Sequence, residues 1–269
     1  MTSELRRFLE THRRVFVLTG AGVSTASGIP DYRDDRGQWK RRPPVMILPF
    51  RSKPDVYRRY WARAFAGWPS FAAAAPGPAH HALAQLEHEG RIAQLVTQNV
   101  DGLHQRAGSR AVIDLHGRLD VVVCLSCGDR HSREHWQTVM DAANAGWAPE
   151  RTQAPDGDAD IADHAVAAFA PPFCHRCGGL VKPDVVFFGE NVSPATYAAA
   201  RESLASADAM LAVGTSLMVY SGFRFVAQAR EAGLPIAILN RGRTRADDLA
   251  DLKVEAEIAT ALDAVRLTG

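Results

Sequence analysis

The sequence lacks the features expected of a membrane protein, an exported protein or a nucleic-acid-binding protein. No uninterrupted apolar stretch approaches the roughly 20 residues that span a bilayer. The opening residues, MTSELRRFLETHRR, contain no apolar signal-peptide core. The formal net charge is only +1, which gives no overall field to gather nucleic acid or lipid. We therefore expect a soluble, cytoplasmic protein with no nucleic-acid or membrane partner.

Apolar runs alternate with helix-like stretches along most of the chain. Its 269 residues suffice for one large domain, alone or with a smaller companion. Short runs rich in Val, Ile and Leu predict buried parallel strands at 15–19, 92–97, 185–188, 209–215 and 234–239. Helices are expected between them, at 80–90, 195–207 and 221–233. This alternation predicts an α/β fold, a Rossmann-like parallel sheet covered by helices on both faces.

Two regions interrupt the alternation and predict an inserted smaller domain. One is rich in Arg, Pro and Trp, and the other carries all four cysteines. We expect the sheet domain to comprise residues 1–33, 78–117 and 180–269. The smaller domain would then combine a helical module, 34–77, with a metal-binding module, 118–179.

The cysteines form two C-x-x-C pairs with none left over. The ligand set is Cys124, Cys127, Cys174 and Cys177, which suits a zinc ribbon with four thiolates. The gap between the pairs exceeds the roughly 15–20 residues of a compact ribbon, so an insert lies between the knuckles. Two disulfides or four core thiols are the alternatives, and the lack of an export signal favours one structural zinc ion. His131 and His175 lie close enough in sequence to be spare ligands, although such histidines more often face solvent.

Polar residues follow several predicted strands, at the edge where open α/β sheets bind ligands. These ends carry Gly20 and Gly22, then Asn99 and Asp101, then Gly214 to Ser216, and finally Asn240. Together they indicate a dinucleotide site. Taken alone, the Asn99–Asp101 stretch also reads as an ordinary polar turn. His116 likewise reads as a surface or core histidine, and its spacing does not single it out.

The first glycine loop departs from the usual dinucleotide pattern. A third glycine is expected three residues after Gly22, but it comes only at Gly28, and the loop continues into Ile-Pro-Asp-Tyr-Arg.

These segments, in this order, resemble the sirtuins, the NAD-dependent protein deacylases. The likeness covers nearly the whole chain and includes GAGVSTASGIPDYR, TQNVDGLHQRAG, LHG, the C-x-x-C pairs, KPDVVFFGE, GTSL and ILNRG. RYWARAFAGWP, VYSGFRF and LPIAILNRGRTRADDLA are most similar to the class II branch, which includes the human mitochondrial lipoamidase and ADP-ribosyltransferase.

The resemblance implies roles for individual residues. The implied NAD-binding residues are Gly20, Ala21, Gly22, Thr25, Ile29, Asp31, Tyr32, Arg33, Gln98, Asn99, Val100, Asp101, Gly214, Thr215, Ser216, Asn240, Arg241, Gly242 and Ile258. The implied catalytic residues are His116, as general base, with Asn99 and Asp101. The implied substrate segment, which pairs with an acyl-lysine protein or peptide as an added strand, is Val185, Val186, Phe187, Phe188 and Gly189.

The implied reaction cleaves nicotinamide from NAD and passes the acyl group to ADP-ribose. Its products are nicotinamide, O-acyl-ADP-ribose and free lysine, which makes the enzyme an acyltransferase. The stretch MVYSG after GTSL and the loop DDRGQWKRRPP depart from many deacetylating sirtuins, so longer acyl groups are plausible substrates. The alternatives are a mono-ADP-ribosyltransferase that uses the same NAD site and a non-catalytic NAD-sensing or zinc-ribbon module. We expect a monomer.

Overall fold

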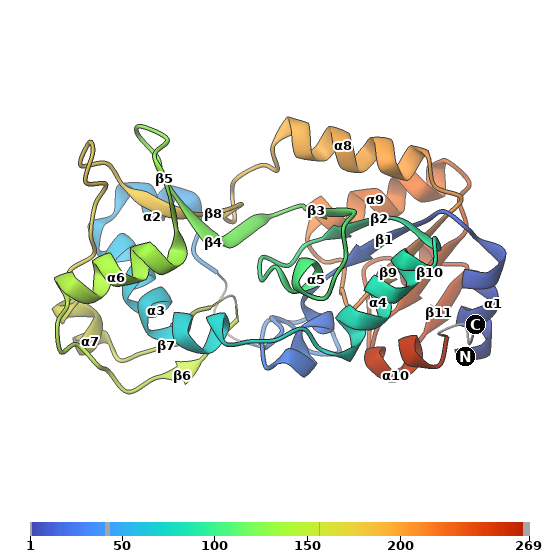
Figure 1. Ribbon diagram of the computed structural model, residues 1–269, viewed down its shortest axis with the longest axis horizontal. Helices are drawn as coiled ribbons and strands as arrows, with labels where there is room; N and C mark the ends of the chain where they lie inside the picture. The colour runs from blue at the N-terminus through green and yellow to red at the C-terminus, as the bar shows by residue number, and fades with distance from the viewer. Residues whose placement is uncertain (1, 41–43, 156, 266–269) are drawn as a thin grey trace. The chain divides into compact units, whose positions relative to one another are not determined.

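The computed structural model describes residues 2–40, 44–155 and 157–265. Internal contacts divide the chain into two compact units (Figure 1). Unit 1 consists of Met1–Arg42, Ala75–Leu115 and Val192–Gly269, and unit 2 of Pro43–Ala74 and His116–Asn191, both taken over the described residues. None of the helices in the described ranges is long and apolar enough to cross a membrane.

Unit 1 contains a six-stranded parallel sheet in the order β11-β10-β9-β1-β2-β3. The strands are β1 (Val15–Thr19), β2 (Ile92–Thr97), β3 (Val112–Asp114), β9 (Ala209–Val213), β10 (Ile236–Leu239) and β11 (Leu252–Val254). Four of them match the apolar runs expected to be parallel strands, and the predicted α/β class is confirmed. The edge strands β3 and β11 have only three residues each, too few for a clear sequence signal.

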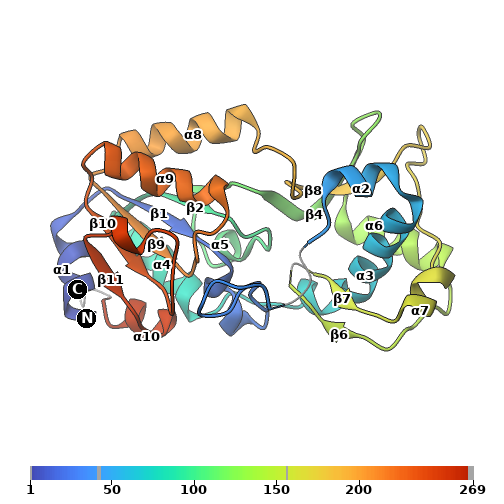
Figure 2. The same cartoon turned by 180° about the vertical axis from the view of Figure 1, so that it is seen from behind.

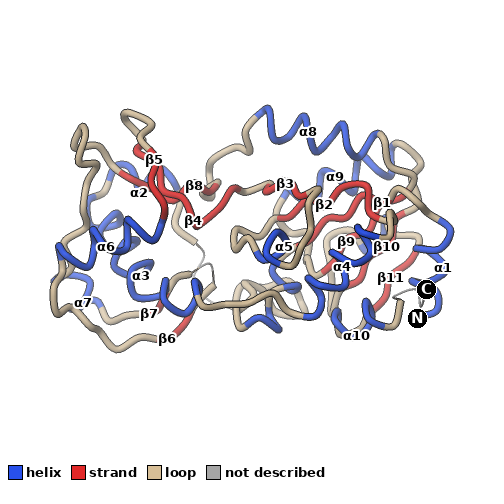
Figure 3. The backbone as a smooth tube through the Cα atoms, in the orientation of Figure 1, coloured by secondary structure: helices blue, strands red, loops and turns tan. Residues whose placement is uncertain are grey.

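Helices cover both faces of this sheet (Figures 2 and 3). One face packs against α1 (Thr2–Thr11), α4 (Pro78–His88) and α10 (Ile258–Asp263), and the other against α8 (Pro194–Ala205) and α9 (Tyr220–Glu231). Side chains alternate along β1: Val15 and Val17 enter the first core, and Phe16 and Leu18 the second. Both sets are fully buried, as expected for a strand covered on both sides. Four short elements complete the unit, namely η1 (Ala21–Val23), η2 (Thr25–Ser27), α5 (Leu103–Arg106) and η3 (Asp247–Leu249).

Unit 2 is built around a three-stranded antiparallel sheet in the order β5-β4-β8. The sheet comprises β4 (Gly117–Cys124), β5 (Arg130–Ser132) and β8 (Val181–Val185), and β6 (Thr152–Gln153) pairs with β7 (Ala159–Asp160). The helices are α2 (Ile47–Ser52), α3 (Pro54–Ala72), α6 (Arg133–Ala143) and α7 (Asp163–Ala168). An aromatic core holds these elements together, and the indole N–H of the buried Trp61 donates to the Val181 carbonyl at 3.0 Å.

The interpretation of residues 185–188 as a buried parallel strand is wrong. Only Val185 lies in a strand, β8, which runs antiparallel to β4 in unit 2. A short apolar run carries no information about its partner, and the partner here is the strand that leads into the first cysteine pair. The chain beyond Val185 leaves the sheet, and Phe188 makes an isolated bridge to Met46.

Candidate functional site

The glycine loops after β1 and β9 lie in contact at the carboxyl edge of the unit 1 sheet. The Gly20 N–H donates to the Val213 carbonyl at 3.2 Å, and the Gly22 N–H donates to the Gly214 carbonyl at 2.9 Å. A Cβ on Gly22 would lie 2.9 Å from that same oxygen, so a larger residue would force the loops apart. The chain continues from β1 to β2 on one side, while β9 lies on the other. This is the switch point where parallel sheets bind nucleotides.

The segment that follows the first glycine loop folds back on itself within unit 1. The Lys40 N–H donates to the Tyr32 carbonyl at 2.9 Å, and Arg33 and Trp39 form a β-bridge. The Arg33 guanidinium stacks over the Trp39 ring at 3.8 Å, and burial lowers its pKa from the usual value. Asp31 forms a 2.6 Å ion pair with Lys40. The predicted NAD-binding residues of this segment are therefore held by the segment's own far end.

Asn99 and Asp101, at the end of β2, are held by one hydroxyl group. The Ser24 Oγ donates to Asp101 Oδ2 at 2.7 Å and accepts from Asn99 Nδ2 at 3.0 Å. The second carboxylate oxygen, Asp101 Oδ1, accepts from the Leu103 N–H at 2.8 Å. The structure thus brings these two predicted catalytic residues together and fixes both side chains.

His80 completes the hydrogen bonding of Ser24. The Gly77 N–H donates to His80 Nδ1 at 3.1 Å, so the proton of the neutral ring is on Nε2, which faces the Ser24 Oγ at 3.3 Å. Ser24 therefore uses its single donor and both acceptor positions. Desolvation lowers the pKa of His80 to about 4, although the charge of Asp101 opposes that shift.

A second buried histidine packs against the first. The rings of His80 and His104 lie 4.9 Å apart, and His104 Nε2 contacts the Thr19 hydroxyl at 2.9 Å. That hydroxyl donates to Thr97 Oγ1 at 2.8 Å, so it accepts from His104. Desolvation, and to a lesser degree the charge of His80, lowers the pKa of His104 to about 3. Both rings are consequently neutral near pH 7.

Sequence reasoning missed Ser24, His80 and His104 as parts of the site. Ser24 lies inside the motif GAGVSTASGIPDYR, but nothing in the sequence distinguishes it from its neighbours. The contact between Ser24 and His80 spans 56 residues, and it exists only because α4 packs beside the first glycine loop. No local pattern encodes such a contact.

The predicted residues on β2 and β9 also meet. Gln98 Nε2 donates to Thr215 Oγ1 at 2.9 Å and to the Thr19 carbonyl at 3.1 Å. Ile258 of α10 lies against Gly214, because a Cβ added to Gly214 would fall 2.9 Å from Ile258 Cδ1. Leu217 has φ of 56°, an uncommon value for a non-glycine residue that often marks functional loops.

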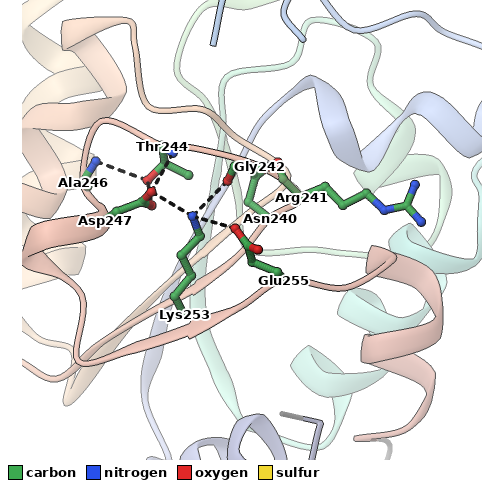
Figure 4. A network of polar contacts seen from close by, with 8 residues as sticks. All are labelled: Asn240, Arg241, Gly242, Thr244, Ala246, Asp247, Lys253 and Glu255. Carbon is green, nitrogen blue, oxygen red and sulfur yellow. Dashed lines mark hydrogen bonds and ion pairs between the residues drawn. The ribbon is translucent and has the colours of Figure 1, made fainter. Parts of the chain in front are cut away.

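The loop after β10, which carries Asn240, Arg241 and Gly242, is held by a lysine of β11 (Figure 4). The Lys253 ammonium donates to the Gly242 carbonyl at 2.9 Å and to Asp247 Oδ2 at 2.8 Å. Asp247 in turn accepts from the Thr244 hydroxyl at 2.6 Å. Desolvation disfavours the charge on Lys253, but its bonds to Asp247 and Glu255 outweigh that cost and raise the pKa. Sequence reasoning missed Lys253, which no motif includes.

The predicted general base His116 belongs to unit 2, where it adjoins the predicted substrate segment. The Val186 N–H donates to the His116 carbonyl at 2.8 Å, and Gly117 pairs with Val185. Glu190 shapes the segment, because its Oε2 accepts from the Phe187 N–H at 2.8 Å and from the Lys182 ammonium at 2.9 Å. How His116 acts with Asn99 and Asp101, which lie in unit 1, stays a prediction.

The four cysteines converge in unit 2 with the spacing of a tetrahedral metal centre. The Sγ atoms of Cys124 and Cys177 are 3.5 Å apart, those of Cys127 and Cys174 are 3.7 Å apart, and all four lie within 4.8 Å of one another. Zn–S bonds of about 2.3 Å place tetrahedral thiolates about 3.8 Å apart, whereas a disulfide requires about 2.05 Å. None of the four is in a disulfide, so the disulfide alternative is wrong and the set fits one zinc ion.

Comparisons with known proteins point to one family. A family model described as the Sir2 family matches residues 20–221. A protein of Xanthomonas campestris pv. campestris (strain 8004), named NAD-dependent protein deacetylase, is 58% identical over 96% of this chain and 88% of its own length. A Bos taurus protein named NAD-dependent protein lipoamidase sirtuin-4, mitochondrial, is 48% identical over 94% of this chain and 82% of its own length.

Solved structures agree with these relatives. A complex described as Sir2 with a p53 peptide and NAD⁺ has a TM-score of 0.78 and 32% identity, and covers 98% of this chain and 97% of that chain. A Sir2 protein bound to a propionylated peptide has a TM-score of 0.76 and 31% identity, with 98% and 96% coverage.

Proposed function

The chain belongs to the Sir2, or sirtuin, family, and from that membership we propose that it is an NAD-dependent protein-lysine deacylase. It consumes NAD as a co-substrate, releases nicotinamide and transfers the acyl group of a modified lysine to ADP-ribose. The observation that carries this proposal is the network around Ser24, which fixes Asn99 and Asp101 together beside the glycine loop. Polar groups held in fixed positions suit a reaction at the nicotinamide ribose better than the binding of NAD without catalysis.

Each part of the NAD site has a distinct task in this proposal. The loops Gly20–Gly22 and Gly214–Ser216 bind the pyrophosphate, as glycine-rich loops at strand ends do. The amides of Gly20 and Gly22 serve to hold the two loops together. Ile29 and Asp101 line the nicotinamide pocket, and Gln98 with Asn99 positions the ribose. Asn240 binds on the adenosine side, where the bond from Lys253 to the Gly242 carbonyl keeps the loop in place.

His116 acts as the general base that removes a proton from a ribose hydroxyl. A neutral imidazole suits this step at cellular pH, and general-base assistance contributes about 10²–10⁴-fold. The hydrogen bond between the His116 carbonyl and the Val186 N–H supports a base that adjoins the acyl-lysine segment. The zinc ion has a structural task, because four thiolates complete its coordination shell and leave no position for substrate.

The substrate class is an acyl-lysine protein or peptide, bound along residues 185–189. Relatives named for deacetylation and for lipoamide removal both support this class. We infer that acetyl groups and longer acyl groups are both accepted. Strand addition uses backbone groups, so sequence preference around the lysine should be weak.

A panel of acylated peptides tests the proposal. Purified protein is incubated with NAD and peptides that carry acetyl, propionyl, longer acyl or lipoyl lysine, and the products are identified by mass. O-acyl-ADP-ribose in step with free lysine supports deacylation. Protein-linked ADP-ribose without lysine release would instead support the mono-ADP-ribosyltransferase, and NAD binding without nicotinamide release would support a sensor.

We also propose a monomeric protein that acts in the cytoplasm. Four cysteines placed as zinc ligands rather than in disulfides support this location, because such use of cysteine is typical of reducing compartments. Light scattering at the mass of one chain and fractionation of cells test the two statements separately.

A further inference from the structure

A second group of metal-binding side chains lies on the cysteine knuckles. Asp129, His131 and His175 each place one ligand atom within 4.8 Å of the other two. The Nε2 atom of His131 is 3.1 Å from Asp129 Oδ2, and that of His175 is 4.0 Å from the same oxygen. None of these residues belongs to the four-thiolate set.

These separations suit a single small cation. Imidazole nitrogens and carboxylate oxygens bind zinc at about 2.0–2.2 Å, so two ligands of one ion lie about 3 to 4.2 Å apart, depending on their angle. Both separations from Asp129 Oδ2 fall in that interval. The ring centroids of His131 and His175 are 5.1 Å apart, and the ring planes are inclined at 54°.

The backbone holds the group in place and leaves it open to solvent. The Cys124 N–H donates to the Asp129 carbonyl at 2.8 Å, and His131 pairs with Val122 in the β4–β5 hairpin. His175 lies in the second knuckle, which the Gly178 N–H closes onto the Cys174 carbonyl at 2.8 Å. The side chains of Asp129 and His131 are about a quarter exposed (25% and 24%), and that of His175 is 68% exposed.

The surrounding charges favour a cation. Arg130 on the hairpin is already paired with Asp184, and Arg176, which follows His175, is exposed to solvent. A zinc ion bound by four thiolates leaves a net charge of about −2 on the adjacent knuckles. A carboxylate and two imidazoles are a donor set that transition metals prefer over magnesium or calcium.

We propose that Asp129, His131 and His175 form a second, solvent-open binding site for a divalent transition metal, with zinc as its natural occupant. Three protein ligands leave at least one position for water or for a group from a partner molecule. The site is weaker than the four-thiolate centre and exchanges its ion independently. It does not depend on the proposed deacylase activity.

Equilibrium dialysis against zinc, followed by metal analysis, tests this site in the full-length chain. The protein is first treated with a weak chelating resin that leaves the thiolate-bound zinc in place. Wild type should then rise from one to two zinc ions per chain. His131→Ala and His175→Ala should each weaken the second step by at least about tenfold, the loss that follows removal even of a partner outside the ligand shell.

His164→Ala is the matched control, because His164 is an exposed histidine of the same unit outside the group. It should still take up the second ion. Retention of the first zinc ion shows that each variant is folded. Cobalt provides a second readout: weak visible bands without intense thiolate-to-metal absorption place it at the nitrogen and oxygen ligands. A wild type that stops at one ion, or a second ion that survives both substitutions, would overturn the proposal.

Discussion

The Ser24 hydroxyl donates a 2.7 Å hydrogen bond to Asp101, across 77 residues of sequence. The same oxygen accepts from Asn99, so one small side chain sets the positions of two polar groups at the end of β2. Its neutral partner His80 is buried and cannot supply a competing charge near pH 7.

Replacing Ser24 with alanine should lower both catalysis and stability, because Asp101, Asn99 and His80 each lose a hydrogen-bond partner. A hydrogen bond to a charged group is worth about 1.5–3 kcal/mol, so kcat/KM for nicotinamide release should fall about tenfold to a hundredfold. Ser27→Ala is the control, because the buried Ser27 hydroxyl of the same loop has no hydrogen-bond partner among the described residues. Equal losses in the two variants would rule out a specific role for Ser24.

The buried histidines make stability depend on pH. Their folded-state pKa values, about 4 for His80 and about 3 for His104, lie below the unfolded value of about 6.5. Unfolded chains thus bind more protons, and stability falls as pH drops below about 6.5 until the folded pKa is reached. Between pH 7 and pH 5 each ring should lower the free energy of unfolding by about 2 kcal/mol.

Urea unfolding at pH 7 and pH 5 measures this dependence. His104→Gln removes one of the two rings, so its stability should change less with pH than that of wild type. Loss of zinc at acid pH should lower the stability of both proteins alike. It therefore cancels when the slope of stability against pH is compared between wild type and His104→Gln. Identical slopes would contradict the assignment of His104 as a buried neutral ring.

Lys253 offers a test of the loop on the adenosine side. Lys253→Met removes the bonds to the Gly242 carbonyl and to Asp247 while it keeps most of the side-chain volume. Because one hydrogen bond contributes about 1 kcal/mol, KM for NAD should rise about fivefold with kcat nearly unchanged. Lys253→Arg should restore part of the affinity, and Lys53→Met, at an exposed lysine, should change neither constant. A fall in kcat alone would contradict a positioning role.

Removal of the thiolate-bound zinc should loosen unit 2 more than unit 1. The two knuckles meet through the four Sγ atoms, whereas the core of unit 1 contains no cysteine. Hydrogen exchange after treatment with a strong chelator should show faster exchange in β4, β5 and β8 and little change in β1, β2 and β9. Re-addition of zinc should reverse it. Uniform exchange across both sets of strands would argue against a local structural role.

The sequence patterns that predicted the structure correctly are local ones. The C-x-x-C pairs encode their knuckle within four residues, and the continuous apolar run in Val15–Thr19 follows from burial on both faces of a central strand. Short apolar runs flanked by helical stretches were therefore enough to predict the parallel sheet.

The features that sequence patterns did not predict depend on contacts between residues far apart in the chain. Val181–Val185 pairs with β4 across more than fifty residues, and nothing in its own composition reveals that partner. His80 and Lys253 acquire their tasks from the loops that pack against them, so a single sequence does not distinguish them from ordinary helix and strand residues.

The decisive measurement of deacylase activity is nicotinamide release from NAD, followed with and without an acetyl-lysine peptide in wild type and His116→Ala. Wild type should release nicotinamide only when the peptide is present, with one O-acyl-ADP-ribose formed per nicotinamide. The variant should fold, retain zinc and lose turnover by about 10²–10⁴-fold. Release that ignores the peptide, or near wild-type deacylation by His116→Ala, would contradict the proposed mechanism.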